Sequence, residues 1–217
     1  MTAEQDQIQQ QVKQIKQSFR LIMDGKIASS MREKGLEYKL NWGASLPFLK
    51  EMAQDIINGQ QRTGNSLYSL AIALWKEDVR ECKILATMLM PAEEMLPEVC
   101  DIWMEQMPSQ EMAEQASFNL WQHLPYAPRK AYEWIASDKE LYQLCGFHVL
   151  SRLFMNGQEP NERGINEYID QLISALQGPS ISVRKAAYQS VQRFANLGLV
   201  YERMANSALK NVNLDIF

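Results

Sequence analysis

The sequence predicts an all-α fold in which short antiparallel helix pairs stack into an α-α superhelix. Three observations support this prediction. Good helix formers, above all Gln, Glu, Leu, Ala, Met and Lys, dominate the 217 residues. Val, Ile and Thr never cluster with the period-two alternation of a β-strand. Gly and Pro recur at intervals of roughly 10 to 20 residues, the spacing that connections between short helices require.

The first half of the chain is expected to form seven helices. Ser45, Ser66 and Asp78 can cap helix N-termini through their side-chain oxygens, and Asn65 is an alternative to Ser66. Pro91 is expected to open the sixth helix. The expected ranges are 4–22, 26–34, 45–57, 65–75, 78–89, 91 to the break at 108, and 109–121.

The second half continues this pattern. Pro125 and Pro128 bracket a turn, and the expected N-caps beyond it are Asp138, Asn161 and Ser180. A long helix is expected over 139–155, further helices at the next two caps, and an amphipathic stretch at about 197–211. The total is about twelve helices in six antiparallel pairs.

The helix after Ser180 carries a repeat pattern. Its segment 182–187, SVRKAA, followed by Val191, resembles the inner helix of a HEAT repeat, where Val, paired Ala and a later aliphatic residue pack between layers. Such short helices cannot bury their apolar faces alone, so they must stack. We therefore expect a single HEAT-like domain over 1–217, with a compact helical bundle as the alternative. Its expected parts are a capping helix at 1–25, a repeat core at 26–196, and a last helix and tail at 197–217.

Composition restricts the class of protein further. No apolar run is long enough to span a bilayer, and the polar N-terminal stretch does not resemble a secretory signal. Cys82, Cys100 and Cys145 lack the spacing of a zinc site or disulfide framework and indicate the thiols of a reducing compartment. His123 and His148 have no ligand motif around them, and phosphate-loop, dinucleotide and hydrolase motifs are absent. We expect a cytoplasmic protein with no metal, cofactor or membrane contact.

Charge is unevenly distributed along the chain. The net charge is −4, which argues mildly against a generic nucleic-acid binder. Residues 75–114 hold ten acidic and three basic side chains, whereas residues 176–210 hold five basic and one acidic. A polyanion should therefore prefer the C-terminal third. Arg184, Lys185 and Arg193 are the candidate phosphate contacts there, although structural roles for them remain open.

Three short sequence stretches occur in the same order and at the same spacing as in a known protein family. They are LNWGA at 40–44 with flanking residues from 31 to 56, LW at 74–75 with VRE at 79–81, and WIASD at 134–138 before a long helix. Together with the helix that carries 184–187, they make residues 26–196 similar to the AlkD-like DNA alkylation repair family. This family consists of HEAT-like proteins and includes DNA glycosylases for alkylated purines.

The resemblance implies a concave surface made by the second helix of each pair. In active members an Asp, two Trp and an Arg surround the lesion, and the carboxylate stabilises the oxocarbenium-like centre that forms as the glycosidic bond breaks. In this chain Gln115 stands at the Asp position, Glu111 and Gln189 at the Trp positions, and Leu144 at the Arg position. Because all four depart from the active pattern, no catalytic residue can be assigned and glycosylase activity stays open.

Glu111 and Glu114 are the remaining catalytic candidates. They lie one helical turn apart, and a shift of one residue in the alignment would bring Glu114 to the Asp position. One interpretation makes one of them a displaced carboxylate that stabilises charge. The interpretation we favour is a solvated acidic face.

The five tryptophans could stack on bases, but helical spacing favours packing between repeats for most of them. Trp75, Trp103, Trp121 and Trp134 end apolar faces, so we expect them in the core. Trp42 follows Asn41 in a loop and is the one expected to be exposed.

Three functional hypotheses follow. The first is a family member, with its excision site lost, that binds duplex DNA or a related polyanion through the concave face in a salt-dependent manner. The second is a non-enzymatic scaffold for a protein or peptide, which the acidic middle favours. The third is an active glycosylase that uses a displaced carboxylate.

Overall fold

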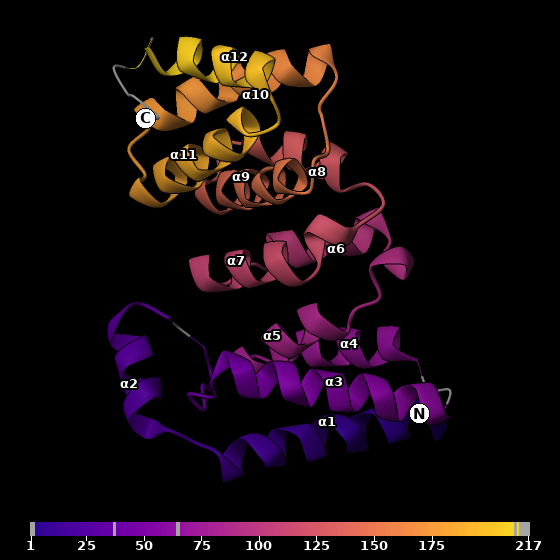
Figure 1. Ribbon diagram of the computed structural model, residues 1–217. Coiled ribbons are helices and arrows are strands. Elements are labelled where there is room, and N and C mark those ends of the chain that lie inside the picture. The colour runs from indigo at the N-terminus through magenta and orange to yellow at the C-terminus, as the bar shows by residue number, and fades with distance from the viewer. Residues whose placement is uncertain (1–2, 37, 64–65, 211, 213–217) are drawn as a thin grey trace. The chain divides into compact units, whose positions relative to one another are not determined.

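The computed structural model describes residues 3–36, 38–63, 66–210 and 212, without the side chains of residues 3 and 60–63. Twelve α-helices and two short 3-10 helices form within this part of the chain, and its extended pairing is limited to one isolated bridge. The all-α prediction is therefore confirmed. The chain divides into two compact units, Met1–Leu120 and Trp121–Phe217, which are described in turn (Figure 1).

The first unit contains seven α-helices. Helix α5 lies at its centre, because it packs against α3, α4 and α7, while α1 packs against α4. The helices are α1 (Ala3–Leu21), α2 (Gly25–Glu33), α3 (Leu46–Thr63), α4 (Leu67–Trp75), α5 (Arg80–Leu89), α6 (Pro97–Glu105) and α7 (Gln110–Asn119), with the 3-10 helix η1 (Ala92–Glu94) before α6.

Stacked aromatic rings join α4 to α6. The rings of Trp75 and Trp103 lie 4.2 Å apart with 3° between their planes, and both side chains are buried. The Trp75 indole N–H donates to Gln106 Oε1 at 3.0 Å, which satisfies its polar end. As expected, these tryptophans belong to the core.

The loop before α3 is fixed to the start of α5. Leu40 and Val79 form the isolated parallel bridge, in which Leu40 N donates to Asp78 O at 3.2 Å and Arg80 N donates to Leu40 O at 3.1 Å. Gly43 has a φ of 73°, and a Cβ there would collide with the carbonyl oxygen of Asp24. Only glycine fits this close approach of two backbone segments.

The second unit arranges its helices in two layers. Helices α9 and α11 pack tightly against each other, α10 contacts both α8 and α12, and α8 packs on α9 (Figure 1). This alternation is the stacking that the repeat pattern predicted. The elements are η2 (Trp121–His123), α8 (Ala127–Ile135), α9 (Glu140–Met155), α10 (Glu162–Gln177), α11 (Ile181–Ala195) and α12 (Leu199–Lys210).

Most predicted N-caps are confirmed, and three helix starts are corrected. The predicted caps Ser45, Ser66, Asn161 and Ser180 each accept a backbone N–H at a helix start. Asp24 and Ser109, which were not predicted as caps, do the same for α2 and α7. Asp78 and Asp138 do not cap, since α5 and α9 start after Val79 and Lys139, whose side chains make no cap hydrogen bond. Pro91 precedes η1 rather than opening α6. Asn65 and the expected tail at 213–217 lie outside the described residues.

No helix in the described part of the chain combines the length and apolar character that a bilayer crossing needs.

Candidate functional site

The carboxylate of Glu111, on α7, binds the guanidinium of Arg80, on α5. Arg80 Nη2 donates to Glu111 Oε1 at 2.6 Å, and Arg80 Nε donates to Oε2 at 2.9 Å. Burial alone would lower the pKa of Arg80, but the hydrogen bond and charge of Glu111 outweigh it, and the pKa is raised. Glu111 therefore neutralises a buried cation, and the expected solvated acidic face is wrong for this residue.

A second carboxylate, Glu81, extends this buried cluster to the loop before α3. It accepts backbone N–H bonds from Trp42 at 3.1 Å and from Ala44 at 3.2 Å, while Arg80 Nη1 donates to Ala44 O at 3.1 Å. Arg80 and Glu81 are almost completely buried. The VRE segment that carried the family resemblance thus holds three elements of the first unit together.

Glu114 and Gln115 are both half-buried on α7. Glu114 Oε1 accepts a hydrogen bond from Gln110 Nε2, one turn earlier, at 2.9 Å. No described cation pairs with the Glu114 carboxylate, whereas the Glu111 carboxylate is paired with Arg80. Gln115, at the position expected for the catalytic Asp, supplies no charge.

The remaining two family positions lie in the second unit. Leu144 on α9 is 1% exposed and belongs to the core, so it does not face a ligand. Gln189 on α11 is exposed. Neither residue offers the cation or aromatic face of the active pattern.

Packing of α9 on α11 gathers positive charge. Lys185, Gln189 and Arg193 follow one another at one-turn spacing on the exposed side of α11. Burial, and then the charge of nearby Arg193, lower the pKa of Arg152 on α9. Because α9 packs on α11, the positive charge of Arg193 acts on Arg152. We call Arg152, Lys185 and Arg193 the basic strip.

The sequence identified only part of the basic strip. Lys185 and Arg193 were predicted phosphate contacts, and both are exposed. Arg184, the third predicted contact, is also exposed but projects from α11 about 100° away from Lys185. Arg152 was missed, because 41 positions separate it from Arg193 and only the α9–α11 contact brings them together.

The tryptophans offer little surface for base stacking. Trp75, Trp103, Trp121 and Trp134 are each at most 3% exposed. Trp42 is half-buried, with the Arg20 guanidinium 5.9 Å from its ring centre. Trp42 is thus the most accessible of the five, but it is half-buried and not exposed as expected.

The fold matches a known architecture. A solved structure, described as "A new family of proteins related to the HEAT-like repeat DNA glycosylases with affinity for branched DNA structures", superposes with a TM-score of 0.77. The alignment covers 92% of this chain and 82% of that chain at 16% identity. This likeness confirms the predicted HEAT-like helical repeat fold.

The amino-acid sequence itself matches a known family. No curated protein matches the sequence. The family model of the "DNA alkylation repair enzyme" matches residues 15–186, which is most of the 217-residue chain. The chain belongs to the DNA alkylation repair enzyme family.

Proposed function

We propose that this chain binds DNA through the basic strip on α9 and α11 of the second unit. The exposed side of α11, where Lys185 and Arg193 lie on a helix packed against the Arg152 helix α9, is the observation that carries the proposal. Two guanidinium groups and a lysine on helices that pack together can each pair with a phosphate of a DNA backbone. Arg184, on the neighbouring side of α11, would extend the contact.

We further propose that the known alkylpurine excision site has been lost. The position of the catalytic Asp holds Gln115, and the carboxylate of Glu111 is already bound to Arg80. A neutral amide cannot stabilise a developing oxocarbenium charge as a carboxylate does. The protein would then be a DNA-binding pseudoenzyme.

Branched DNA is the first substrate to test. The structurally similar protein is described as having affinity for branched DNA structures. A branch point presents phosphates from more than one duplex arm, so it offers more contacts to a short basic surface than a linear duplex does. We propose that a junction binds more tightly than a linear duplex of equal length.

Arg193→Glu should weaken DNA binding about tenfold and reduce the salt slope by about one, because one phosphate contact is lost and a repulsive charge is introduced. Fluorescence anisotropy with labelled duplex, abasic duplex and four-way junction, at low and moderate salt, measures both quantities. The matched control is Arg163→Glu, which reverses an exposed charge on α10 outside the basic strip. Equal losses in the two variants, or no salt-dependent binding by the wild type, would contradict the proposal.

Incubation with DNA that contains N-methylated purines should release no base above background. Chromatography of the released bases, with an active alkylpurine glycosylase as positive control, checks this. Glu114 is the residue through which activity could still arise, since its carboxylate has no cationic partner among the described side chains. Release that Glu114→Gln abolishes would establish the displaced-carboxylate enzyme instead.

A protein-binding scaffold is the remaining alternative. The acidic middle of the chain favoured it, but part of that charge is neutralised internally, by Arg80 at Glu111 and by Lys16 at Glu77. We therefore rank the protein-binding scaffold behind DNA binding. We also propose a reducing compartment such as the cytoplasm, which the three buried free cysteines support.

A further inference from the structure

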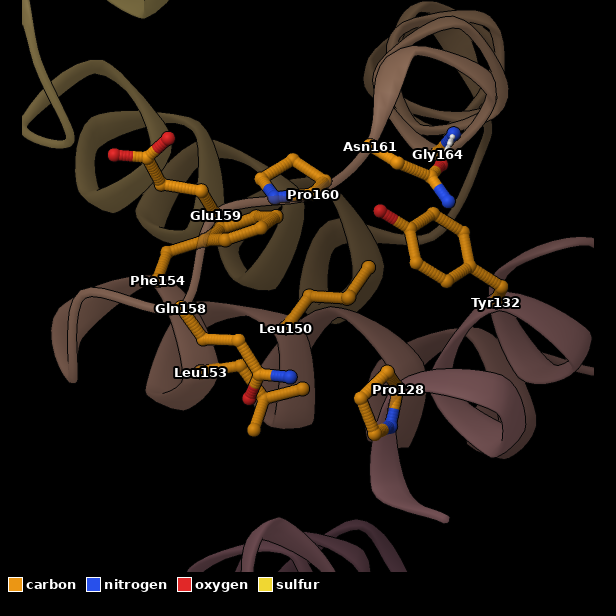
Figure 2. A pocket seen from close by; sticks show the side chains of 10 residues that line it. All are labelled: Pro128, Tyr132, Leu150, Leu153, Phe154, Gln158, Glu159, Pro160, Asn161 and Gly164. Carbon is orange, nitrogen blue, oxygen red and sulfur yellow. Dashed lines mark hydrogen bonds between the residues drawn. The ribbon is translucent and has the colours of Figure 1, made fainter.

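A cavity of about 270 Å³ lies within the second unit, between α8, α9 and α10 (Figure 2). Its wall is mainly apolar, formed by Pro128, Leu150, Leu153, Phe154 and Pro160. A cavity of roughly 150 Å³ in another protein already accommodates benzene. The space here is therefore large enough for a substituted ring.

One polar group in this apolar wall lacks a partner. The Tyr132 hydroxyl oxygen is buried, and no described residue hydrogen-bonds to it. Figure 2 shows it pointing between Pro160 and Leu150. Burial, and then the charge of Glu167, raise the pKa of Tyr132 to about 12, so the hydroxyl keeps its proton at neutral pH. It is available as a hydrogen-bond donor.

The surroundings of Tyr132 hold its hydroxyl in this position. A Cβ at Gly164 would lie 2.9 Å from the hydroxyl oxygen, so the glycine at the start of α10 leaves the room that the ring needs. Asn161 Oδ1 accepts the Gly164 N–H at 2.8 Å as the N-cap of α10. The hydroxyl thus lies at a mainly apolar wall without a hydrogen-bond partner among the described residues.

Charges around the cavity balance. The cavity and the adjoining groove over α8 and α10 are lined by two cations, Arg129 and Arg163, and by two anions, Glu159 and Glu167. Glu159 also accepts a hydrogen bond from the Tyr201 hydroxyl at 2.8 Å. In the lining of the cavity itself the one charged side chain is Glu159, so the site does not favour an anion. A neutral ligand fits it best.

We propose that this cavity binds a small neutral ring compound with one hydrogen-bond acceptor, which accepts a hydrogen bond from the Tyr132 hydroxyl. A buried donor without a partner costs free energy, and a ligand that supplies the acceptor removes this cost. The site is separate from the basic strip and does not depend on DNA binding. It is a small-molecule site on the α8–α10 side of the second unit.

Acetophenone and ethylbenzene are suitable probes, because they have similar size and only the first carries an acceptor. In ¹H–¹⁵N NMR titrations of the full chain, acetophenone should shift the amides of Asn161 and Gly164 saturably and bind more tightly than ethylbenzene. Tyr132→Phe should weaken acetophenone about tenfold, the value of one hydrogen bond, and leave ethylbenzene unchanged. Tyr142→Phe, on α9 outside the cavity wall, is the matched control and should change neither probe.

Gly164→Ala provides a second variant, which changes the cavity wall beside the Tyr132 hydroxyl and leaves the Tyr132 side chain present. Its added methyl group would displace the Tyr132 hydroxyl, so acetophenone should lose affinity while α10 remains folded by circular dichroism. No saturable shift with either probe would overturn the proposal. Equal affinity for both probes, unaffected by Tyr132→Phe, would also overturn it and would instead indicate an apolar socket for a partner's side chain.

Discussion

Arg80→Met is expected to lower the free energy of unfolding by about 3–5 kcal/mol, because it leaves the buried carboxylate of Glu81 and the half-buried carboxylate of Glu111 without their cation. The Arg80 side chain is 2% exposed and the Glu81 side chain is 0% exposed. Methionine has a similar length and fills the space of the aliphatic stem, so the loss reports the charge and not a cavity. Urea denaturation followed by circular dichroism at 222 nm measures the change.

The control for Arg80 is Arg32→Met, the same substitution at an exposed position of α2. It should change the stability by no more than about 0.5 kcal/mol. In an Arg80→Met background, adding Glu111→Gln should recover part of the loss, because one of the uncompensated charges is removed. A loss below about 1 kcal/mol in Arg80→Met would show that the cluster is not a main support of the first unit.

Gly146→Ala is expected to destabilise the protein by about 1–3 kcal/mol, against the helix preference for alanine. Gly146 lies inside α9, where a Cβ would be 2.6 Å from Ile135 Cγ2 and 2.8 Å from the carbonyl oxygen of Ala131. Both atoms belong to α8, so the methyl group would force the two helices apart. Thermal and urea denaturation measure the sign and the size of the change in the free energy of unfolding.

Gly59→Ala is the control for Gly146→Ala, because the same substitution at this position is expected to stabilise the protein. Gly59 lies inside α3 with nothing within 4 Å of an added Cβ, so alanine should stabilise the helix by about 0.5–1 kcal/mol. If both variants gained stability, the close α8–α9 contact would be incorrect. If both lost stability by equal amounts, the close contact at Gly146 would not explain the effect.

Local signals predicted most helix starts. A serine or asparagine cap accepts a backbone N–H within three residues of its own position, so it can be recognised from the local sequence. Ser66 and Ser180 are examples. The same reasoning predicted a cap at Asp78, and that prediction was wrong. Its carbonyl oxygen accepts the Leu40 N–H, and the bridge to that distant loop sets where α5 begins.

The candidate site depends on contacts between distant positions. Arg80 and Glu111 are 31 residues apart, and an acidic side chain on an amphipathic helix ordinarily indicates a solvated face. Arg152 and Arg193 likewise meet only once α9 packs on α11. Composition located the basic region, but tertiary packing determined which cations lie together.

The salt dependence of DNA binding by Lys185→Glu/Arg193→Glu tests the central claim most directly. Wild-type binding should weaken linearly on a plot of log Kobs against log salt concentration. The double variant should give a slope shallower by about 1.8, since two phosphate contacts are lost. An unchanged slope in a folded double variant, or a wild type without salt-dependent binding, would contradict a DNA-binding basic strip on α9 and α11.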